Sequence, residues 1–390
     1  MQPHDASDHA PLPTAQRAPA LKPRRIAVAL QGGGSHGAFT WGVLDRLLEQ
    51  PQFDIVGVSG TSAGAMNAAI LADGLNRGGR AEARKALRQY WEDVGRLPGF
   101  ASFAPPLAAG LPRSWHLDNA PLYVWFDMLT RIWSPYQINP LNHNPLRSLL
   151  ERIDFESLAH DPAAPRLFVC ATNVRTGMRR IFDNSELSID VLLASACLPQ
   201  LYQAVKIGDD IYWDGGYTGN PALAPLYLRT EATDVIIVGI NPLVRADVPR
   251  TARDIINRID EISFNSSFML ELGAIAFIEE ILKAGTSQAR KLPFVHGIRD
   301  SALAEFGASS KMNNAPAFLH HLREIGWQAA DHWLSMHGND VGSGSTVDLS
   351  HLIPMKDSVV PHLVAAAGER SVRAGDERRP HQNGSFPPPR

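Results

Sequence analysis

Two short apolar runs near the N-terminus each lead directly into a glycine-rich turn and then into a stretch of helical character. Residues 26–30 precede the glycines of 32–37, and residues 55–58 precede the turn 60–64. A strand, tight turn and helix repeated in this way are typical of parallel sheets, whose strands need crossover helices. The two turns therefore predict a single site at one edge of such a sheet.

Further apolar runs extend the same pattern along the chain. Residues 166–171 and 234–240 are almost continuously apolar, as expected of strands that are buried on both faces. We predict strands at 25–30, 54–58, 166–171 and 234–240, with shorter strands near 180–183 and 210–213. The sequence thus predicts an α/β fold with a mostly parallel central sheet covered by helices on both faces.

Composition divides the chain into one α/β domain, residues 24–367, and two predicted disordered ends. Residues 1–23 form a polar, proline-containing arm without the apolar stretch of a signal peptide, and 368–390 form a charged, proline-rich tail. A long helix is expected at 251–283, where Glu271, Glu279 and Glu280 interrupt the apolar run and argue against a transmembrane span. Core packing is the expected role of this helix, with docking on lipid as the second.

Residues of about 95–145 form an insertion rich in proline and aromatic residues, with one helix predicted near 120–133. Two roles are open for it. It is a lid or acyl-chain channel over the site, or it covers a face of the sheet.

The formal net charge of −3, with both signs spread along the chain, gives no basis for binding nucleic acid. Cys170 and Cys197 lack metal or redox spacing, so a reduced, cytoplasmic protein is expected. No metal or cofactor is predicted: His320 and His321 point about 100° apart on a helix, and Asp209–Asp210 favours a solvated turn over a calcium loop.

The turn at 60–64 has the pattern Gly-x-Ser-x-Gly of a nucleophile elbow. A serine on such a strained turn projects its hydroxyl clear of the sheet, which requires that Gly60 and Gly64 have no side chains. Ser62 is therefore the candidate nucleophile.

The glycines of 32–37 are compatible with more than one role. A dinucleotide site would need an acidic residue at the end of the next strand, but Asp54 stands at its start. A phosphate-binding P-loop would need a Gly-Lys-Ser/Thr sequence, which does not follow. The remaining interpretations are a tight turn, or an oxyanion hole formed by the amides of Gly32, Gly33 and Gly34.

With a small-residue block at 194–199 and the sequence Asp214-Gly215-Gly216, these turns occur in an order that resembles the patatin-like phospholipase family. The resemblance implies a three-layer α/β fold and a lipid acyl hydrolase in which Ser62 is the nucleophile and Asp214 the general base. It also implies motif roles for Gly37, Gly60, Gly64, Gly215 and Gly216, an acyl ester such as a phospholipid as substrate, and peripheral contact with a lipid surface. The chain departs from the family at His36, where an arginine or lysine is usual, so the contribution of that cation is either pH-dependent here or dispensable.

Other functions use parts of the same pattern. A Ser-His-Asp triad would draw its base from the downstream histidines, which are His296, His320, His321 and His332. An acyltransferase would use the dyad but pass the acyl group to another acceptor, and a non-catalytic lipid-binding protein could keep the fold.

Overall fold

A mixed eight-stranded sheet forms the middle layer of the protein in a computed structural model that describes residues 23–98, 115–118, 120–245, 248–284 and 292–349. The strands are β1 (Arg24–Leu30), β2 (Phe53–Gly60), β3 (Arg166–Asn173), β4 (Arg179–Asp183), β5 (Val205–Ile207), β6 (Asp210–Asp214), β7 (Asp234–Val238) and β8 (Phe294–Ile298). Their order is β5-β6-β3-β2-β1-β7-β8, and β4 also pairs with β3. The strands from β3 to β8 in this order are parallel, whereas β4, β5 and β6 are joined by antiparallel pairing.

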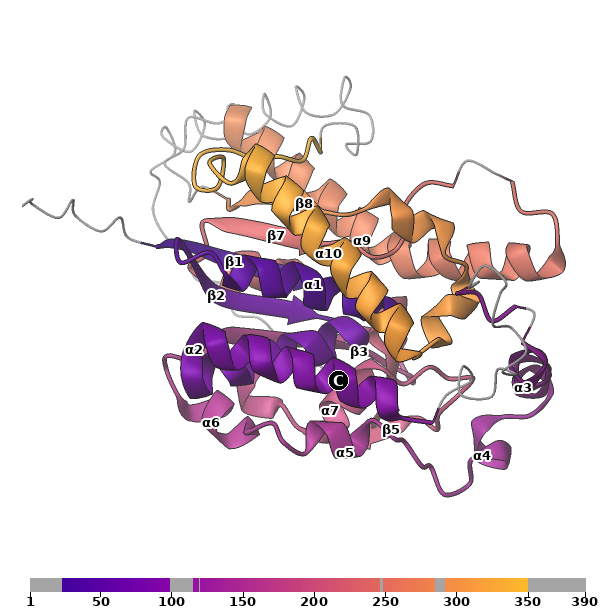
Figure 1. The fold of residues 1–390 in the computed structure, drawn as a ribbon. Helices are drawn as coiled ribbons and strands as arrows, with labels where there is room; N and C mark the ends of the chain where they lie inside the picture. The colour runs from indigo at the N-terminus through magenta and orange to yellow at the C-terminus, as the bar shows by residue number, and fades with distance from the viewer. Residues whose placement is uncertain (1–22, 99–114, 119, 246–247, 285–291, 350–390) are drawn as a thin grey trace, which may run out of the picture.

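Helices cover both faces of the sheet, which confirms the predicted fold class (Figure 1). The helices are α1 (Gly37–Leu48), α2 (Ala63–Arg96), α3 (Pro121–Ile132), α4 (Pro135–Ile138), α5 (Arg147–Leu150), α6 (Phe155–His160), α7 (Ile189–Ser195), α8 (Ala224–Arg229), α9 (Ala252–Ala284) and α10 (Pro316–His337). Short 3₁₀ turns are η1 (Gly34–His36), η4 (Asn184–Glu186), η5 (Gly215–Tyr217), η6 (Ser301–Glu305) and η7 (Ala308–Met312).

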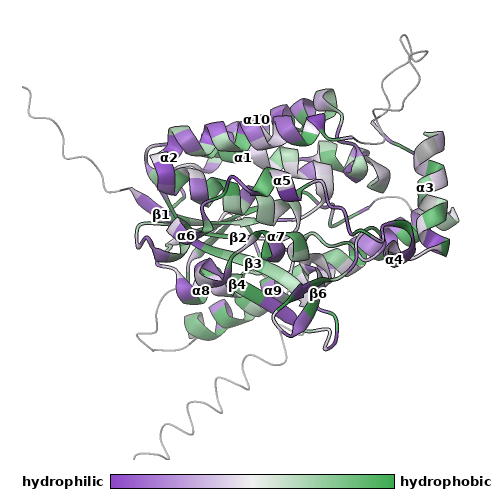
Figure 2. Ribbon diagram, turned by 90° about the horizontal axis from the view of Figure 1, so that it is seen from below, coloured by the Kyte–Doolittle hydropathy of each residue, from purple (hydrophilic) through white to green (hydrophobic). Residues whose placement is uncertain are grey.

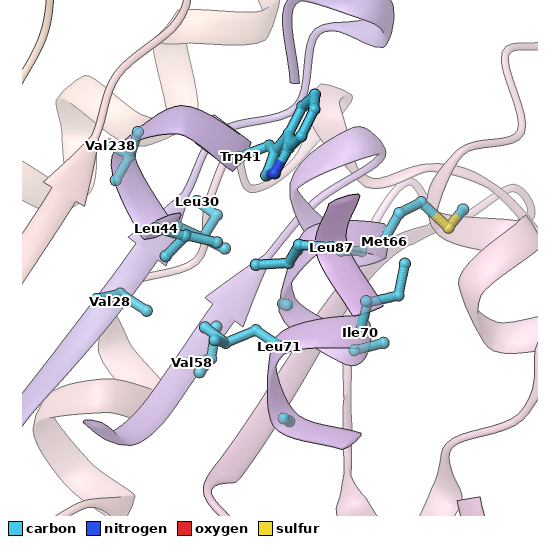
Figure 3. Packing of buried hydrophobic residues seen from close by; sticks show 14 of the residues in the cluster. Val28, Leu30, Trp41, Leu44, Val58, Met66, Ile70, Leu71, Leu87 and Val238 are labelled. Atoms are coloured by element: carbon cyan, nitrogen blue, oxygen red, sulfur yellow. The ribbon is translucent and has the colours of Figure 1, made fainter. Parts of the chain in front are cut away.

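Alternation along β1 explains the two cores. Val28 and Leu30 face the layer that contains α1, α2 and α10, where Trp41 and Leu87 pack (Figure 3). Ala27 and Ala29 face the opposite layer, which α8 and α9 provide. Successive side chains of a strand point to opposite faces, so one run of five apolar residues supplies both cores.

All six predicted strands are present, but β5 and β8 were not predicted. The three residues of β5 are too short to give a pattern, and β8 contains His296 and Gly297. Most of the predicted terminal arms lies outside the described residues, as do residues 99–114 and 119 of the insertion, and the predicted domain boundaries remain predictions.

Helix α9 combines a buried and an exposed side. By length and composition alone, its segment Asp254–Leu282 could cross a membrane, with 33% of the tested window buried. Phe268 and Leu272 pack in the core beneath the sheet, and Glu271 Oε2 accepts hydrogen bonds from the amides of Leu223 and Ala224 at 2.6 and 3.0 Å. This half of α9 therefore packs as a core helix.

Candidate active site

Ser62 lies on a strained turn between β2 and α2, at the carboxyl end of the parallel strands. Its backbone angles are φ 55° and ψ −125°, in the left-handed half of the map that non-glycine residues rarely adopt. A Cβ on Gly60 would lie 2.4 Å from the Gly64 carbonyl oxygen, and one on Gly64 would lie 2.2 Å from the Leu30 oxygen. The turn thus has the geometry expected of a nucleophile elbow, and both flanking glycines are sterically required.

Ser195 from the small-residue block holds this turn in place. Its hydroxyl oxygen accepts a hydrogen bond of 2.9 Å from the Ser62 backbone amide, and Ser195 itself is fully buried. The block at 194–199 therefore supports the backbone of the elbow.

The glycine-rich loop lies beside this turn because β1 and β2 are paired in register, with Leu30 opposite Gly60. A Cβ on Gly32 would lie 2.7 Å from the Ser62 Cβ and 2.5 Å from the Thr61 carbonyl oxygen. Gly34 has φ 58°, and a Cβ there would lie 2.4 Å from the Lys311 carbonyl oxygen. Gly32 and Gly34 are thus required for close packing against two different segments.

Buried amide side chains form hydrogen bonds with both polar backbone atoms of Gly32. Its N–H donates to Asn220 Oδ1 at 2.6 Å, and its carbonyl oxygen accepts from Asn241 Nδ2 at 2.8 Å. Gln31 ties the same segments together, since its Oε1 accepts from the Ile240 and Asn241 amides and its Nε2 donates to the Asn220 carbonyl oxygen. Both polar backbone atoms of Gly32 are thus held by hydrogen bonds within the protein.

These bonds correct one expectation for the oxyanion hole. The Gly32 amide is already bonded to Asn220, so it is not free to bind an oxyanion. Within the described residues, we find no hydrogen bond donated by the amides of Gly33, Gly34 or Ala63. These three residues line the cavities around Ser62, so their amides are the donors that remain.

Asp214, the last residue of β6, is fully buried and faces the same site. Its Oδ1 accepts a hydrogen bond of 2.7 Å from the Gly216 amide. Its Oδ2 has no hydrogen-bond partner by distance and angle within the described structure. Burial raises the pKa of Asp214 to about 7, against the opposing effects of the Gly216 amide and the Ser62 hydroxyl. The arrangement therefore places a weakly basic carboxylate beside Ser62.

The glycines after Asp214 are also required by packing. A Cβ on Gly215 would lie 2.1 Å from the Cys170 carbonyl oxygen, and one on Gly216 would lie 2.2 Å from a ring carbon of Phe264. The sequence Asp-Gly-Gly is therefore needed to bring β6 against β3 and α9.

Two cavities meet at Ser62. One, of about 670 Å³, is mainly apolar and extends between α2 and the insertion; its walls include Met66, Trp91, Val94, Phe126, Leu129 and Leu146. The other, of about 420 Å³, also contains Asp214 and is more polar; its walls include Gln200, Tyr217, Asn257, Asp260 and Phe264. The described part of the insertion thus lines the site, as the channel interpretation of 95–145 anticipates.

His36 lies next to the glycine loop but is neutral and turned into the core. Ser310 Oγ donates its hydrogen to the Gly307 carbonyl oxygen at 2.6 Å, so its 2.8 Å contact with His36 Nε2 is accepted from an Nε2–H. His36 Nδ1 is buried without a hydrogen-bond partner in the described structure. Burial, followed by the charge of Lys311, lowers the pKa of His36 to about 3. His36 therefore cannot replace the family cation.

The histidines of the competing triad lie elsewhere. His296 is fully buried, and its Nε2 lies 2.9 Å from Asp234 Oδ1. Asp234 is the first residue of β7, at the end of the sheet opposite to Ser62. His320, His321 and His332 are exposed on α10, and among the described residues no histidine lines either cavity.

Sequence reasoning missed three supporting residues, Asn220, Asn241 and Lys311, and included Ser195 only as a member of the block at 194–199. Asn220 follows Asp214 by six residues, and that proximity to the motif was the available signal. Within the described residues, no group of three or more His, Cys, Asp and Glu side chains has an arrangement that could hold a metal ion.

Comparison with known proteins gives one family. The model of the patatin-like phospholipases matches residues 28–227, slightly more than half of the 390-residue chain. No curated protein gave a significant sequence match.

Solved structures with detectable similarity include VipD from Legionella pneumophila, at 13% identity and a TM-score of 0.34, covering 91% of this chain and 75% of that one. They also include ExoU in complex with SpcU, from the type III secretion system of Pseudomonas aeruginosa. This match has 17% identity and a TM-score of 0.27, covering 90% of this chain and 77% of that one.

The state of His36 predicts a pH dependence of stability. Its pKa is about 3 when folded and about 6.5 when unfolded. Between these values the unfolded chain binds more protons, so His36 lowers the free energy of unfolding by about 1.4 kcal/mol per pH unit as pH falls below 6.5. The free energy of unfolding, measured by urea denaturation at several pH values, should depend on pH less steeply by this amount in His36→Gln than in the wild type. An equal pH dependence of the free energy of unfolding in wild type and His36→Gln would contradict the assignment of His36 as a buried, neutral histidine.

Proposed function

This chain belongs to the patatin-like phospholipase family, and we propose that it hydrolyses carboxylic esters of lipids through a dyad of Ser62 and Asp214. Family membership supports lipid hydrolase activity. The observation that carries the finer proposal is the strained Ser62 beside the buried, unpaired Oδ2 of Asp214, where an apolar and a polar cavity meet.

In the proposed reaction, Asp214 takes the proton from the Ser62 hydroxyl while Oγ attacks the ester carbonyl. The resulting oxyanion accepts hydrogen bonds from the free amides of Gly33, Gly34 and Ala63. The bond to the alcohol then breaks, and Asp214 returns the proton to the departing alkoxide. This leaves an acyl-enzyme on Ser62. Water gives its proton to Asp214 and attacks the acyl group, and the carboxylic acid leaves as Ser62 regains its proton.

The raised pKa of Asp214 fits this role. An ordinary aspartate, with a pKa near 3.9, is a poor base for a hydroxyl. A pKa of about 7 makes the carboxylate more basic while it remains largely ionised above neutrality. Rigid amides that need no reorganisation supply the remaining stabilisation.

We assign the two parts of an ester to the two cavities. Side chains such as Met66 and Leu129 suit a hydrocarbon chain, so the apolar cavity accommodates the acyl group. The polar cavity then receives the alcohol part, since it is the cavity at Ser62 that Asp214 also lines. This orientation places the departing oxygen near the proton on Asp214.

Exposed apolar side chains, of which Trp125 and Ile256 also line the cavities, form a proposed lipid-docking face. On α3 and α4 these are Trp125, Met128, Ile132, Trp133 and Tyr136, and on α9 they are Ile255, Ile256, Ile259 and Ile262. Figures 1 and 2 show α3 at the edge of the molecule. Trp125 is 60% exposed and also lines the apolar cavity, so this face is continuous with the acyl path. Aromatic and aliphatic groups at an open entrance suit a membrane interface.

The dyad predicts separable losses of activity. Ser62→Ala should abolish hydrolysis of p-nitrophenyl butyrate and labelling by a fluorophosphonate, with an unchanged melting temperature. Asp214→Asn should lower kcat by at least about 100-fold, because the amide cannot accept the proton.

Wild-type kcat/KM should fall with acidification around pH 7, as Asp214 becomes protonated. An active Ser62→Ala variant, or a histidine variant as inactive as Ser62→Ala, would refute the dyad.

The apolar cavity predicts a chain-length effect. Leu129→Trp should shorten the acyl path and lower the ratio of kcat/KM for p-nitrophenyl palmitate to that for the butyrate by at least about tenfold. Leu141→Trp is the control, because Leu141 is 90% exposed and lines neither cavity. An unchanged ratio in Leu129→Trp would place the acyl chain elsewhere.

The docking face predicts loss of vesicle binding. The double variant Ile132→Glu, Trp133→Ser should sediment with phosphatidylcholine vesicles at least about fivefold less than wild type, because it removes apolar area and adds a charge. Leu228→Glu is the control on α8, where Leu228 is 76% exposed. Equal binding by both variants would show that α3 does not dock.

A further inference from the structure

Lys311 stands at the junction of the two cavities. It lies on η7, outside the segment matched by the family model, and lines both cavities together with Ser62 and Gly34. Its Nζ donates a hydrogen bond of 2.9 Å to Asn241 Oδ1, and Asn241 in turn holds the Gly32 carbonyl oxygen. Lys311 is therefore built into the support of the glycine loop.

The charge of Lys311 has no anionic partner within the described structure. Glu261, the closest acidic influence, is bonded by Arg245 at 2.6 Å and by Arg258 at 3.0 Å. Burial lowers the pKa of Lys311, which shows that its ammonium is poorly solvated. A cation held at a cavity wall without a carboxylate is suited to an anion brought by a ligand. Since His36 is neutral, Lys311 supplies a cation beside the loop, and Arg131 also lines the polar cavity.

Asp260, an exposed residue of α9, provides the opposite charge at the polar cavity. It lines that cavity but not the apolar one, and the described structure gives it no hydrogen bond or ion pair. Burial raises the pKa of Asp260, against the charges of Lys311 and Arg131. A cation from a ligand would therefore be favourable at its carboxylate.

Aromatic rings adjoin Asp260. Phe264 follows it by one turn of α9, and Tyr217 packs against Phe264 with ring centroids 4.9 Å apart. Asp260, Tyr217 and Phe264 all line the polar cavity. A carboxylate beside aromatic rings favours an ammonium or quaternary ammonium group.

From this arrangement we propose that the polar cavity binds the headgroup of a zwitterionic glycerophospholipid, with the phosphate at Lys311 and the ammonium group at Asp260. The inference rests on the proposed reaction at Ser62. In such a lipid the phosphate follows the glycerol that bears the ester, and the ammonium lies beyond it. Lys311 lines both cavities where they meet at Ser62, and Asp260 lines only the polar cavity, so the two charges suit this order. A phospholipid without an ammonium group would use Lys311 but meet Asp260 as a like charge, and a diacylglycerol would use neither.

The test compares phosphatidylcholine, phosphatidylglycerol and diacylglycerol with identical acyl chains in mixed micelles of a neutral detergent. Lys311→Met should lower the kcat/KM of both phospholipids relative to diacylglycerol by at least about tenfold. Asp260→Asn should lower phosphatidylcholine relative to phosphatidylglycerol by at least about fivefold. Lys85→Met on α2 and Glu305→Gln on η6, which lie outside both cavities, are the matched controls and should keep the wild-type ratios.

A second measurement separates this inference from the hydrolase proposal. Binding of short-chain dihexanoyl phosphatidylcholine to the Ser62→Ala protein, measured by calorimetry, needs no catalysis. Affinity should fall when Lys311→Met or Asp260→Asn is added. Unchanged affinities and substrate ratios would overturn the headgroup site even if Ser62 proves catalytic. It would also be overturned if Lys311→Met lowered the kcat/KM for diacylglycerol as much as the kcat/KM for the phospholipids. Lack of ester hydrolysis by the wild type, with binding sensitive to both variants, would instead overturn only the hydrolase proposal.

Discussion

The hydrogen bonds around Gly32 are the constraint on which the site depends. Asn220 and Asn241 hold the two polar atoms of this one residue, and Gln31 connects the same segments at the ends of β1 and β7. A glycine loop without these bonds would sample many conformations, since glycine loses the most entropy when ordered. Satisfying Gly32 internally leaves the next amides as the donors that face Ser62. Asn220 also lies six residues after Asp214, so the network ties the segment bearing Asp214 to the glycine loop.

Parallel pairing explains why the site is where it is. Leu30, Gly60 and Val238 lie at the same level across β1, β2 and β7, so the segments that follow them meet at one edge of the sheet. Asp214 reaches this edge differently, because β6 runs antiparallel to β3 with Asp214 opposite Ala171. The Asp214 carboxylate thus lies at a strand end, and Gly215 is needed where the chain passes the Cys170 carbonyl oxygen at close range.

The sequence predicts the fold class, the turn at Ser62, the glycine-rich loop and the Asp-Gly-Gly sequence. Each of these depends on local features, which are apolar runs, glycine spacing and short loops. It does not predict the fate of the Gly32 amide, because Asn220 is 188 residues away and nothing local marks it as a partner. The neutrality of His36 was equally hidden. It follows from a buried site between Phe306 and Phe318 and from Ser310, which all come from the C-terminal part of the chain. Long-range polar contacts of this kind leave no periodic signal.

The link between His36 and Lys311 shows how a change at a family position can be compensated. His36 donates to Ser310, the residue immediately before Lys311, and the carbonyl of Lys311 packs against Gly34. A charged arginine or lysine at position 36 would have to desolvate among the aromatic rings that surround His36, at a large cost in free energy. A neutral imidazole fits there and anchors η7 instead. The anchored turn then presents Lys311 at the cavity, so the positive charge beside the glycine loop comes from a different element with a different direction of approach. On this view the C-terminal third of the chain is part of the active site, because it supplies the charge that the glycine-rich motif lacks.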